Sequence, residues 1–283
     1  MLKINAYAKI NLFLDIKSRR TDGFHDIISY MQTVSLADVL TFDSNESGEI
    51  HVKGNYDVDE KSDLTYRAAE LFMARYGITY GVNINVDKRI PMQGGLAGGS
   101  VDAAATLRGL NELFSLNRPV AELAELGARL GSDVPFCVVG GGKLTYGRGE
   151  ILKDAPKLPD CGIVIVKGKT GCSTPAQFKA LDEKYNNFIG YVPKTDKLDA
   201  MLAAIEQNDI KKLGENLYNI FEDAPGYDRS SLNIMKKNGA YGTLLSGSGS
   251  SVFGIFEDIK AAKKSVEALE ANGFTAFACE PRN

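Results

Sequence analysis

Residues 91–111 read PMQGGLAGGSVDAAATLRGLN, and this stretch is the most informative part of the chain. Four glycines and one serine fall within seven positions, residues 94–100, directly before an alanine-rich helical pattern. Glycine lets the backbone adopt positive φ and approach a ligand closely. The first N–H groups of a helix carry partial positive charge and attract anions. The stretch therefore predicts a loop and a helix start that together hold phosphate.

The two common nucleotide-binding motifs do not fit this chain. A P-loop has lysine after its second glycine, whereas Ser100 follows Gly99, and no G-x-G-x-x-G is complete. Residues 168–170 read GKT like the end of a P-loop, but Ile163 stands where its first glycine belongs. The alternative is a flexible connection, yet such a loop rarely leads directly into a helix with serine at the N-cap. We expect Ser100 to cap the helix and Asp102 to point away from the phosphates.

The composition bounds the class of protein. The chain has 283 residues, of which 44% are apolar and 24% charged, as in a globular protein of one large or two ordinary domains. Its net charge of −3 gives no electrostatic reason to expect a nucleic-acid or membrane partner. The four cysteines form no C-x-x-C pair, and no secretory signal is recognised, so we expect a cytoplasmic location. Two histidines argue against a histidine-rich metal site.

The first residues form a clear strand pattern. Residues 4–16 alternate, and the predicted core face carries Ile4, Ala6, Ala8, Ile10, Leu12, Leu14 and Ile16. Lys9 and Asn11 share the opposite face, so their side chains point the same way. Further strand patterns lie at 27–36, 39–42, 82–86, 162–166, 243–246, 252–256 and 274–279, and helical patterns lie at 62–76, 120–130, 175–184, 197–207, 211–217 and 259–272.

Helices and strands are mixed without a regular βαβα order, which favours an α+β fold with mixed or mostly antiparallel sheets. A stretch with two prolines at 154–160 suggests a boundary between a first domain, 1–154, and a second, 155–283. The final strand either closes the second domain or packs back on the first. Residues 132–135 are predicted to be non-helical because Pro135 restricts the residue before it.

Three polar elements have both functional and structural interpretations. Lys9 lies in an otherwise hydrophobic strand, where a solvated strand face is the simplest explanation. Asp133 precedes a proline, where a turn aspartate bonding its own backbone is common. Phe24 and His25 follow a turn glycine, where an aromatic ring can cover the core edge beside a satisfied histidine. None of the three is decisive alone.

The glycine-rich stretch resembles the phosphate-binding signature of the superfamily that contains galactokinase, homoserine kinase, mevalonate kinase and phosphomevalonate kinase. Its pattern Pro-x-x-x-Gly-Leu-x-x-Gly-Ser-x-x-Ala matches from Pro91 to Ala103, and residues 247–249 resemble the superfamily's C-terminal glycine motif. The resemblance implies a two-domain small-molecule kinase with its active site in the cleft between the domains. It also implies ATP-binding residues Pro91, Met92, Gln93, Gly94, Gly95, Leu96, Ala97, Gly98, Gly99, Ser100 and Val101.

Three further stretches resemble one family within this superfamily: AYAKINLFLDI (6–16), TDGFHDI (21–27) and LGSDVPF (130–136). Its members phosphorylate the 2-hydroxyl of 4-diphosphocytidyl-2-C-methyl-D-erythritol, with ATP and Mg²⁺, in non-mevalonate isoprenoid synthesis. The resemblance implies the catalytic pair Lys9 and Asp133, a cytosine grip of Phe24 and His25, and substrate contacts from Asn11, Thr174 and Phe178, with Phe178 completing a sandwich around the base.

Two alternatives stay open. A sister kinase acting on mevalonate, homoserine or a sugar would have no use for the stacking pair Phe24-His25. A catalytically silent, ligand-binding relative would have no need for both Lys9 and Asp133. We expect a monomer or a weak homodimer. Asp63 stands where relatives often carry asparagine near adenine, so the adenine contact is open, and so are the Mg²⁺ ligands, which we expect to be mainly phosphates and water.

Overall fold

The structure, a computed structural model, describes all residues 1–283. Its elements in chain order are β1 (Leu2–Arg19), β2 (His25–Asn45), β3 (Ile50–Gly54), α1 (Leu64–Tyr76), β4 (Gly81–Asp87), α2 (Gly98–Leu113), α3 (Val120–Gly127), α4 (Val134–Val139), β5 (Gly142–Gly147), β6 (Ile151–Asp154), β7 (Gly162–Val166), α5 (Thr174–Lys184), α6 (Thr195–Glu206), α7 (Ile210–Glu215), β8 (Tyr218–Asn219), α8 (Ser230–Lys237), β9 (Gly242–Leu245), β10 (Val252–Phe256), α9 (Ile259–Glu270) and β11 (Ala276–Cys279).

Backbone contacts divide the chain into two compact units that are discontinuous in sequence. The first unit comprises Met1–Ala8, Ala37–Ile90 and Ala97–Val139, and the second comprises Lys9–Leu36, Pro91–Leu96 and Gly140–Asn283. Strands β1 and β2 contribute residues to both units. The domain boundary between residues 154 and 155 and the cleft between the domains stay predictions.

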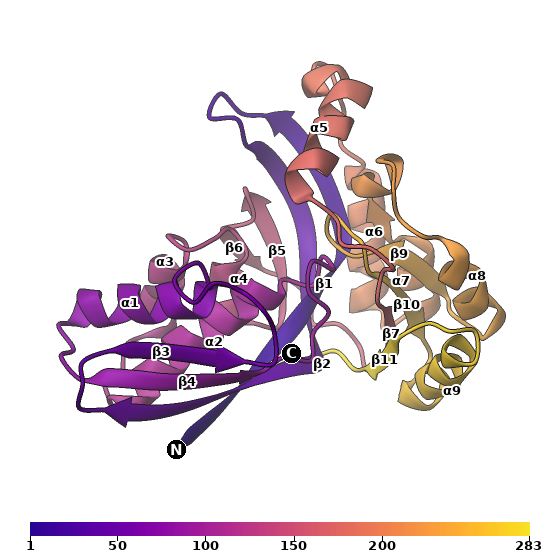
Figure 1. The fold of residues 1–283 in the computed structure, drawn as a ribbon. Helices are drawn as coiled ribbons and strands as arrows, with labels where there is room; N and C mark the ends of the chain where they lie inside the picture. The colour runs from indigo at the N-terminus through magenta and orange to yellow at the C-terminus, as the bar shows by residue number, and fades with distance from the viewer. The chain divides into compact units, whose positions relative to one another are not determined.

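The first unit contains a mixed sheet with helices against it. β4 pairs antiparallel with residues 39–45 of β2 and parallel with β3. Parallel neighbours need a crossover connection, and α1 supplies it between β3 and β4. Helices α1 and α2 lie along one face of these strands (Figure 1). The packing there is close, because a Cβ on Gly109 of α2 would lie 2.6 Å from the Phe42 ring.

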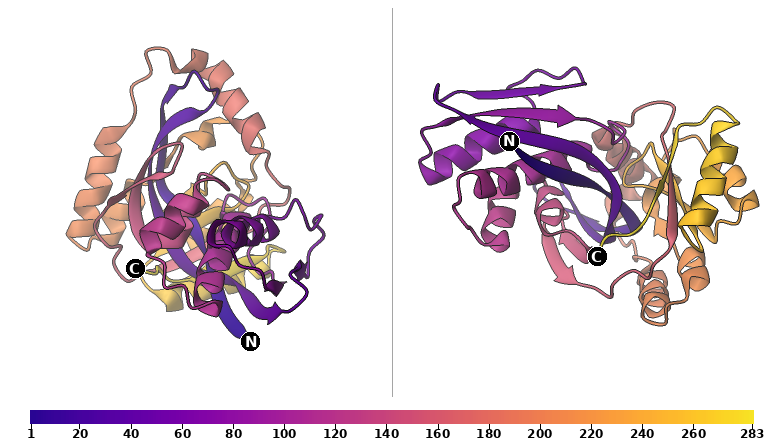
Figure 2. Two further views of the ribbon diagram at one scale, coloured as in Figure 1. Left: turned by 90° about the vertical axis from the view of Figure 1, so that its left-hand side faces the viewer. Right: turned by 90° about the horizontal axis from the view of Figure 1, so that it is seen from below.

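The second unit contains an antiparallel four-stranded sheet in the order β11-β7-β10-β9. Helices α8 and α9 cover it (Figure 2), with Ala262 of α9 against Gly162 and Met235 of α8 against Gly254. In the same unit β5 pairs antiparallel with residues 27–32 of β2 and with β6. The predicted α+β class with mixed and antiparallel sheets is confirmed, and β11 pairs with β7 of this unit.

β1 is buried over a long central stretch. Residues 8–16 are buried on both faces, so the alternation that predicted a core face is real but the opposite face is not solvated. Buried polar groups need partners, and Asp15 has them. Its carboxylate accepts from Tyr191 Oη at 2.9 Å and from the Lys194 amide at 2.8 Å, while burial raises its pKa.

Some local predictions were wrong. Residues 134 and 135 were expected to be non-helical, but they begin α4. Proline is tolerated in the first turn of a helix, where its missing N–H has no intrahelical acceptor to serve. The strands β3, β5 and β6 and the helix α8 were not predicted, because few of their residues are buried and their apolar pattern is therefore weak. None of the helices is both long and apolar enough to cross a membrane.

Candidate active site

The glycine-rich stretch leads into α2 through a left-handed turn. α2 begins at Gly98, and the residue before it, Ala97, has φ 59° and ψ 29° and makes no side-chain capping bond. Ser100 is therefore the third residue of the helix, and the expectation that it forms the N-cap is wrong, because the turn at Ala97 starts the helix earlier. The first N–H groups of a helix have no intrahelical acceptor, so this helix start presents donors of the kind that bind anions.

The two glycine-rich loops contact each other within the second unit through hydrogen bonds to the carbonyls of Gly94 and Gly95. Ser251 N–H donates to the Gly94 carbonyl at 3.2 Å, and the Ser246 hydroxyl donates to the Gly95 carbonyl at 3.1 Å. A Cβ on Gly95, whose φ is +73°, would lie 2.0 Å from the Ser246 carbonyl oxygen. Glycine is thus required at position 95 for two reasons: the backbone has a positive φ, and there is no room for a Cβ.

Lys9 is buried beside this contact. Only 4% of its surface is exposed, its backbone N–H donates to the Leu96 carbonyl at 3.3 Å, and its Nζ donates to Asn11 Oδ1 at 2.7 Å. The Asn11 amide in turn donates to Ser29 Oγ at 2.8 Å. The alternative of a solvated lysine is wrong. Asn11 orients the lysine of the predicted catalytic pair.

Asp133 belongs to the first unit and lies directly before α4. Its backbone carbonyl accepts from the Cys137 N–H at 3.0 Å, which fixes the residue at the start of that helix. Its side chain is partly exposed. Its assignment as the partner of Lys9 in catalysis stays a prediction.

The structure brings His25 and Phe178 together in the second unit. Their rings are stacked with centroids 4.5 Å apart and an interplanar angle of 14°. The imidazole Nε2 lies 2.7 Å from Asp182 Oδ1. His25 therefore rests against the ring face of Phe178, a stack that the predicted cytosine sandwich did not include.

Phe24 lies apart from this stack in its contacts. Half of its surface is exposed (50%), and the Arg148 guanidinium lies 4.8 Å from its ring centroid. Arg148 sits between Gly147 and Gly149, both at positive φ, in the tight turn from β5 to β6. Its backbone N–H donates to the Glu150 carboxylate at 2.6 Å. The turn thus holds a cation against the predicted base-stacking ring.

Thr174, the first residue of α5, contacts the second glycine loop. Its hydroxyl lies 2.7 Å from the Ser248 hydroxyl. This hydrogen bond ties the helix that carries Phe178 to residues 247–249. Within the second unit, the predicted substrate residue Thr174 and the C-terminal glycine motif are therefore directly linked.

A buried ionic cluster supports the start of α2 in the first unit. Lys88 Nζ lies 2.6 Å from Asp38 Oδ2 and 2.5 Å from Asp102 Oδ2, and it donates to the Gly98 carbonyl at 3.1 Å. Asp102 thus turns toward Lys88 and Asp38. Burial raises the pKa of Asp102 to about 8, with the negative charge of Asp38 adding to it against the opposing Lys88.

Three functional candidates were missed by the sequence reasoning: Lys88, Arg148 and Asp182. Asp182 has a signal, because it lies four residues after Phe178 and so on the same helix face. Arg148 has the weaker signal of two flanking glycines. Lys88 has none, since its two carboxylate partners are 50 and 14 residues away in sequence.

The structure contains no group of three or more histidine, cysteine or acidic side chains arranged for a metal ion. Asp63 is the N-cap of α1, where one carboxylate oxygen accepts from the Thr65 N–H and the other from the Tyr56 hydroxyl. Its carboxylate therefore already has structural partners, and the contact with adenine stays open.

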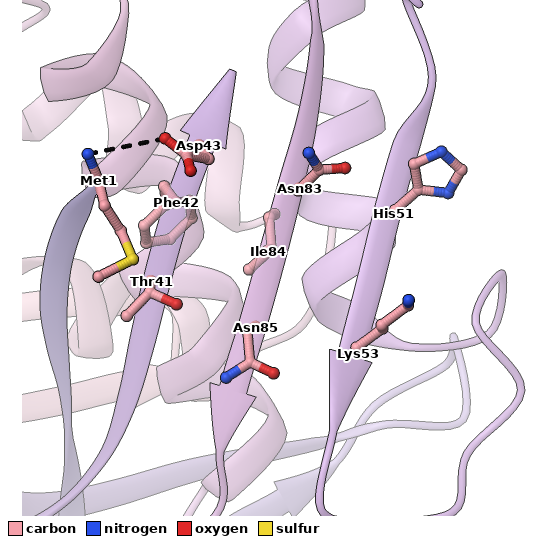
Figure 3. Close-up of a pocket in the computed structure, with 9 residues that line it drawn as sticks. All are labelled: Met1, Thr41, Phe42, Asp43, His51, Lys53, Asn83, Ile84 and Asn85. Atoms are coloured by element: carbon pink, nitrogen blue, oxygen red, sulfur yellow. Dashed lines mark ion pairs between the residues drawn. The ribbon is translucent and has the colours of Figure 1, made fainter. Parts of the chain in front are cut away.

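A hollow of about 420 Å³ lies in the first unit, away from every predicted site residue. Figure 3 shows its side chains along neighbouring strands, among them Thr41, Asn83, His51 and Lys53. The ion pair drawn there joins the Met1 amino group to Asp43 at 3.6 Å, and both groups are well exposed. Such pairs contribute little, and the hollow has no feature of a catalytic site.

Comparison with protein-family models places both glycine loops in a known superfamily. The model of the GHMP kinases N terminal domain matches residues 63–141, and the model GHMP kinases C terminal matches residues 201–274. The first range contains the 91–101 loop and Asp133, and the second contains residues 247–249.

Two relatives with similar sequences are both named 4-diphosphocytidyl-2-C-methyl-D-erythritol kinase. The 4-diphosphocytidyl-2-C-methyl-D-erythritol kinase of Caldicellulosiruptor bescii is 41% identical over 276 residues, covering 95% of this chain and 94% of the relative. That of Exiguobacterium sibiricum is 40% identical over 273 residues, covering 94% and 93%.

Solved structures agree with these relatives. A crystal structure of 4-(cytidine 5'-diphospho)-2C-methyl-D-erythritol kinase matches with a TM-score of 0.80 and 32% identity over 100% of both chains. The L. major mevalonate kinase in complex with R-mevalonate also reaches a TM-score of 0.80, at 16% identity over 100% of this chain and 96% of that one. The latter likeness concerns the fold alone.

We expect Gly95→Ala to destabilise the protein and weaken ATP binding, because the new methyl group overlaps the Ser246 carbonyl. Overpacking and a left-handed alanine together cost about 2–5 kcal/mol of unfolding free energy. Gly77→Ala is the matched control, since Gly77 has φ +66° but no atom within 4 Å of a Cβ. Urea unfolding checks both variants, and an equal loss in the two would contradict the close contact.

The Asp102 carboxyl should make stability depend on pH. Its pKa is raised from 3.8 to about 8 in the folded protein, so the folded state keeps a proton that the unfolded chain releases between these values. The free energy of unfolding should therefore decrease as pH rises from about 4 to about 8, and above that pH this carboxyl should cause no further change. Asp102→Asn cannot titrate, so its urea-unfolding free energy should fall less between pH 5 and 8 than that of the parent. Asp57→Asn, at an exposed carboxylate of the same unit, should follow the parent; an Asp102→Asn curve parallel to the parent would refute this role.

Proposed function

Because the chain belongs to the 4-diphosphocytidyl-2-C-methyl-D-erythritol kinase family of the GHMP kinases, we propose that it phosphorylates the 2-hydroxyl of 4-diphosphocytidyl-2-C-methyl-D-erythritol. ATP is the phosphoryl donor, and the products are the 2-phosphate and ADP, in non-mevalonate isoprenoid precursor synthesis. The main structural observation in support of kinase activity is the hydrogen-bonded contact between the two glycine-rich loops. The position of His25, stacked on Phe178, supports the proposal of a cytidyl substrate.

Phosphoryl transfer has a loose transition state, so the protein mainly positions groups and neutralises charge. The loop 91–101 contains no lysine or arginine, so it can offer phosphate only N–H groups, the α2 dipole and the Ser100 hydroxyl. Lys9 is bonded through its backbone to Leu96 of the same loop. We infer that the Lys9 ammonium supplies the positive charge that the loop lacks.

Asp133 is the proposed general base. Its carboxylate would accept the proton of the 2-hydroxyl as that oxygen attacks the γ-phosphorus of ATP and the bond to the β-phosphate oxygen breaks. General-base catalysis contributes about 10²–10⁴-fold to a rate. The support for this role is the LGSDVPF stretch and the fixed position of the residue before α4.

Phe24 and His25 are the proposed contacts to cytosine. The exposed ring of Phe24 offers a face for stacking, which is worth about 1–3 kcal/mol per base. Phe178 supports the site through its stack on His25. Thr174 and Asn11 complete the proposed set, Thr174 through its link to Ser248 and Asn11 through its bond to Lys9.

We infer that Mg²⁺ enters as its complex with ATP. Mg²⁺ keeps several waters and takes few protein ligands when phosphates are present, which fits a chain with no acidic cluster. The Ser100 hydroxyl would be its protein ligand, and the ion would neutralise phosphate charge. A cytoplasmic location and a monomer or weak homodimer complete the proposal.

The proposed function is tested by a kinase assay across candidate acceptors. With ATP and Mg²⁺, the purified protein should form ADP at the highest kcat/KM with 4-diphosphocytidyl-2-C-methyl-D-erythritol. Mevalonate and homoserine serve as comparison acceptors in a coupled ADP assay. Turnover of either one in preference to the cytidyl substrate would identify a sister kinase, and ATP binding without any turnover would identify a silent relative.

Asp133→Asn should lower kcat by about 10²–10⁴-fold, the usual contribution of a general base. The KM for ATP should change little, because the substitution removes a proton acceptor and no part of the phosphate loop. Glu125→Gln, at an exposed carboxylate of α3 in the same unit, should leave kcat unchanged. Full activity of Asp133→Asn in steady-state assays would exclude this aspartate as the base.

A further inference from the structure

Asp182 stands out as a charged residue that the proposed function has not used, although it contacts a proposed substrate residue. Its Oδ1 lies 2.7 Å from His25 Nε2, and the two side chains are only 14% and 5% exposed. Both residues belong to the second unit, His25 at the start of β2 and Asp182 on α5. The pair is thus a hydrogen bond sheltered from water rather than a surface contact.

One face of α5 holds the imidazole in two ways. Phe178 and Asp182 are four residues apart on this helix, so their side chains lie one turn apart on the same face. Phe178 stacks on the ring plane of His25, and Asp182 bonds the ring edge. Phe188 adds an edge contact at 5.8 Å between centroids. The ring is therefore fixed both in its plane and in its rotation.

The charge on Asp182 determines which nitrogen of His25 carries the proton. Arg19 Nε lies 3.6 Å from Asp182 Oδ2, so these two side chains form an ion pair on the side of the carboxylate away from His25. A carboxylate can only accept hydrogen bonds, so the nitrogen that faces it, Nε2, must carry the hydrogen. In a neutral imidazole the other nitrogen, Nδ1, then presents a lone pair and acts as an acceptor.

We propose that Asp182 is a positioning residue that holds His25 in the Nε2–H form, so that Nδ1 accepts a hydrogen bond from the amino group of the substrate's base. This inference rests on the proposed function. Cytosine presents an amino donor at the position where uracil-type bases present a carbonyl acceptor. A lone pair on Nδ1 can accept a hydrogen bond from the cytosine amino group, but it repels the carbonyl oxygen of a uracil-type base. By holding His25 in this form, Asp182 would determine the specificity for cytosine.

The first experiment compares two substrates that differ only at this position of the base: the cytidyl substrate and its uridyl counterpart. Asp182→Ala should lower the ratio of their kcat/KM values about 10- to 100-fold, the range for losing one positioned hydrogen bond. Asp182→Asn should also lower it, because the amide oxygen is drawn to Arg19 and the amide nitrogen then faces His25. Kinetics with varied ATP should show an unchanged KM for ATP.

Glu183→Ala is the matched control, since Glu183 is the exposed next residue of the same helix. Its ratio should equal that of the parent. Equal losses for both substrates in Asp182→Ala would show a merely structural role and overturn the inference. A parent protein that uses both substrates equally would overturn it as well, whereas one that phosphorylates neither would refute the proposed function itself.

The second experiment reads the tautomer directly, without substrate. The chain has only two histidines, His25 and His51, so His51→Gln assigns their imidazole signals in long-range ¹⁵N–¹H NMR spectra at a pH where both rings are neutral. His25 should show a protonated Nε2 in the parent and a mixture of tautomers in Asp182→Ala. A protonated Nδ1 in the parent would overturn the inference, whatever the kinetics show.

Discussion

The contact between Gly95 and Ser246 is the constraint on which the proposed phosphate site depends. A side chain at position 95 would lie 2.0 Å from the Ser246 carbonyl oxygen, so the two glycine-rich loops can meet only where one of them has no Cβ. Leu96 of the same loop accepts from the Lys9 backbone. One backbone arrangement thus joins the loop after β9, the proposed phosphate loop and the strand that contains the proposed catalytic lysine.

In each unit, buried polar groups have defined partners. Lys9 is oriented by Asn11, and Asn11 by Ser29. In the first unit the Lys88 ammonium contacts the carboxyl groups of both Asp38 and Asp102 and bonds the Gly98 carbonyl, which supports the start of α2. Removing one member of such a cluster leaves an uncompensated buried charge. Substituting one of these buried polar residues should therefore lower the stability of the fold.

The proposed cytosine-binding residues Phe24 and His25 also have defined partners. Arg148 covers one face of Phe24, and the ring of His25 is enclosed by Phe178 and bonded by Asp182. The sequence predicted Phe24, His25 and Phe178 as one group, but it assigned Phe178 to a sandwich around the base. The structure places Phe178 on His25, because α5 brings Phe178 and Asp182 to the same imidazole from one helix face.

Local spacing in the sequence is enough to predict the alternation of β1, most of the longer helices, the α+β class and the glycine positions that permit a phosphate loop. These depend on periodicities of two and 3.6 residues and on backbone freedom. Tertiary packing is what buries Lys9 against Asn11 and starts α2 after Ala97 rather than at Ser100. Packing within each unit also brings Lys88 to the Gly98 carbonyl, Arg148 to Phe24 and Asp182 to His25. Those contacts join residues up to 157 positions apart, and burial and pairing at such separation arise from packing, which no local pattern records.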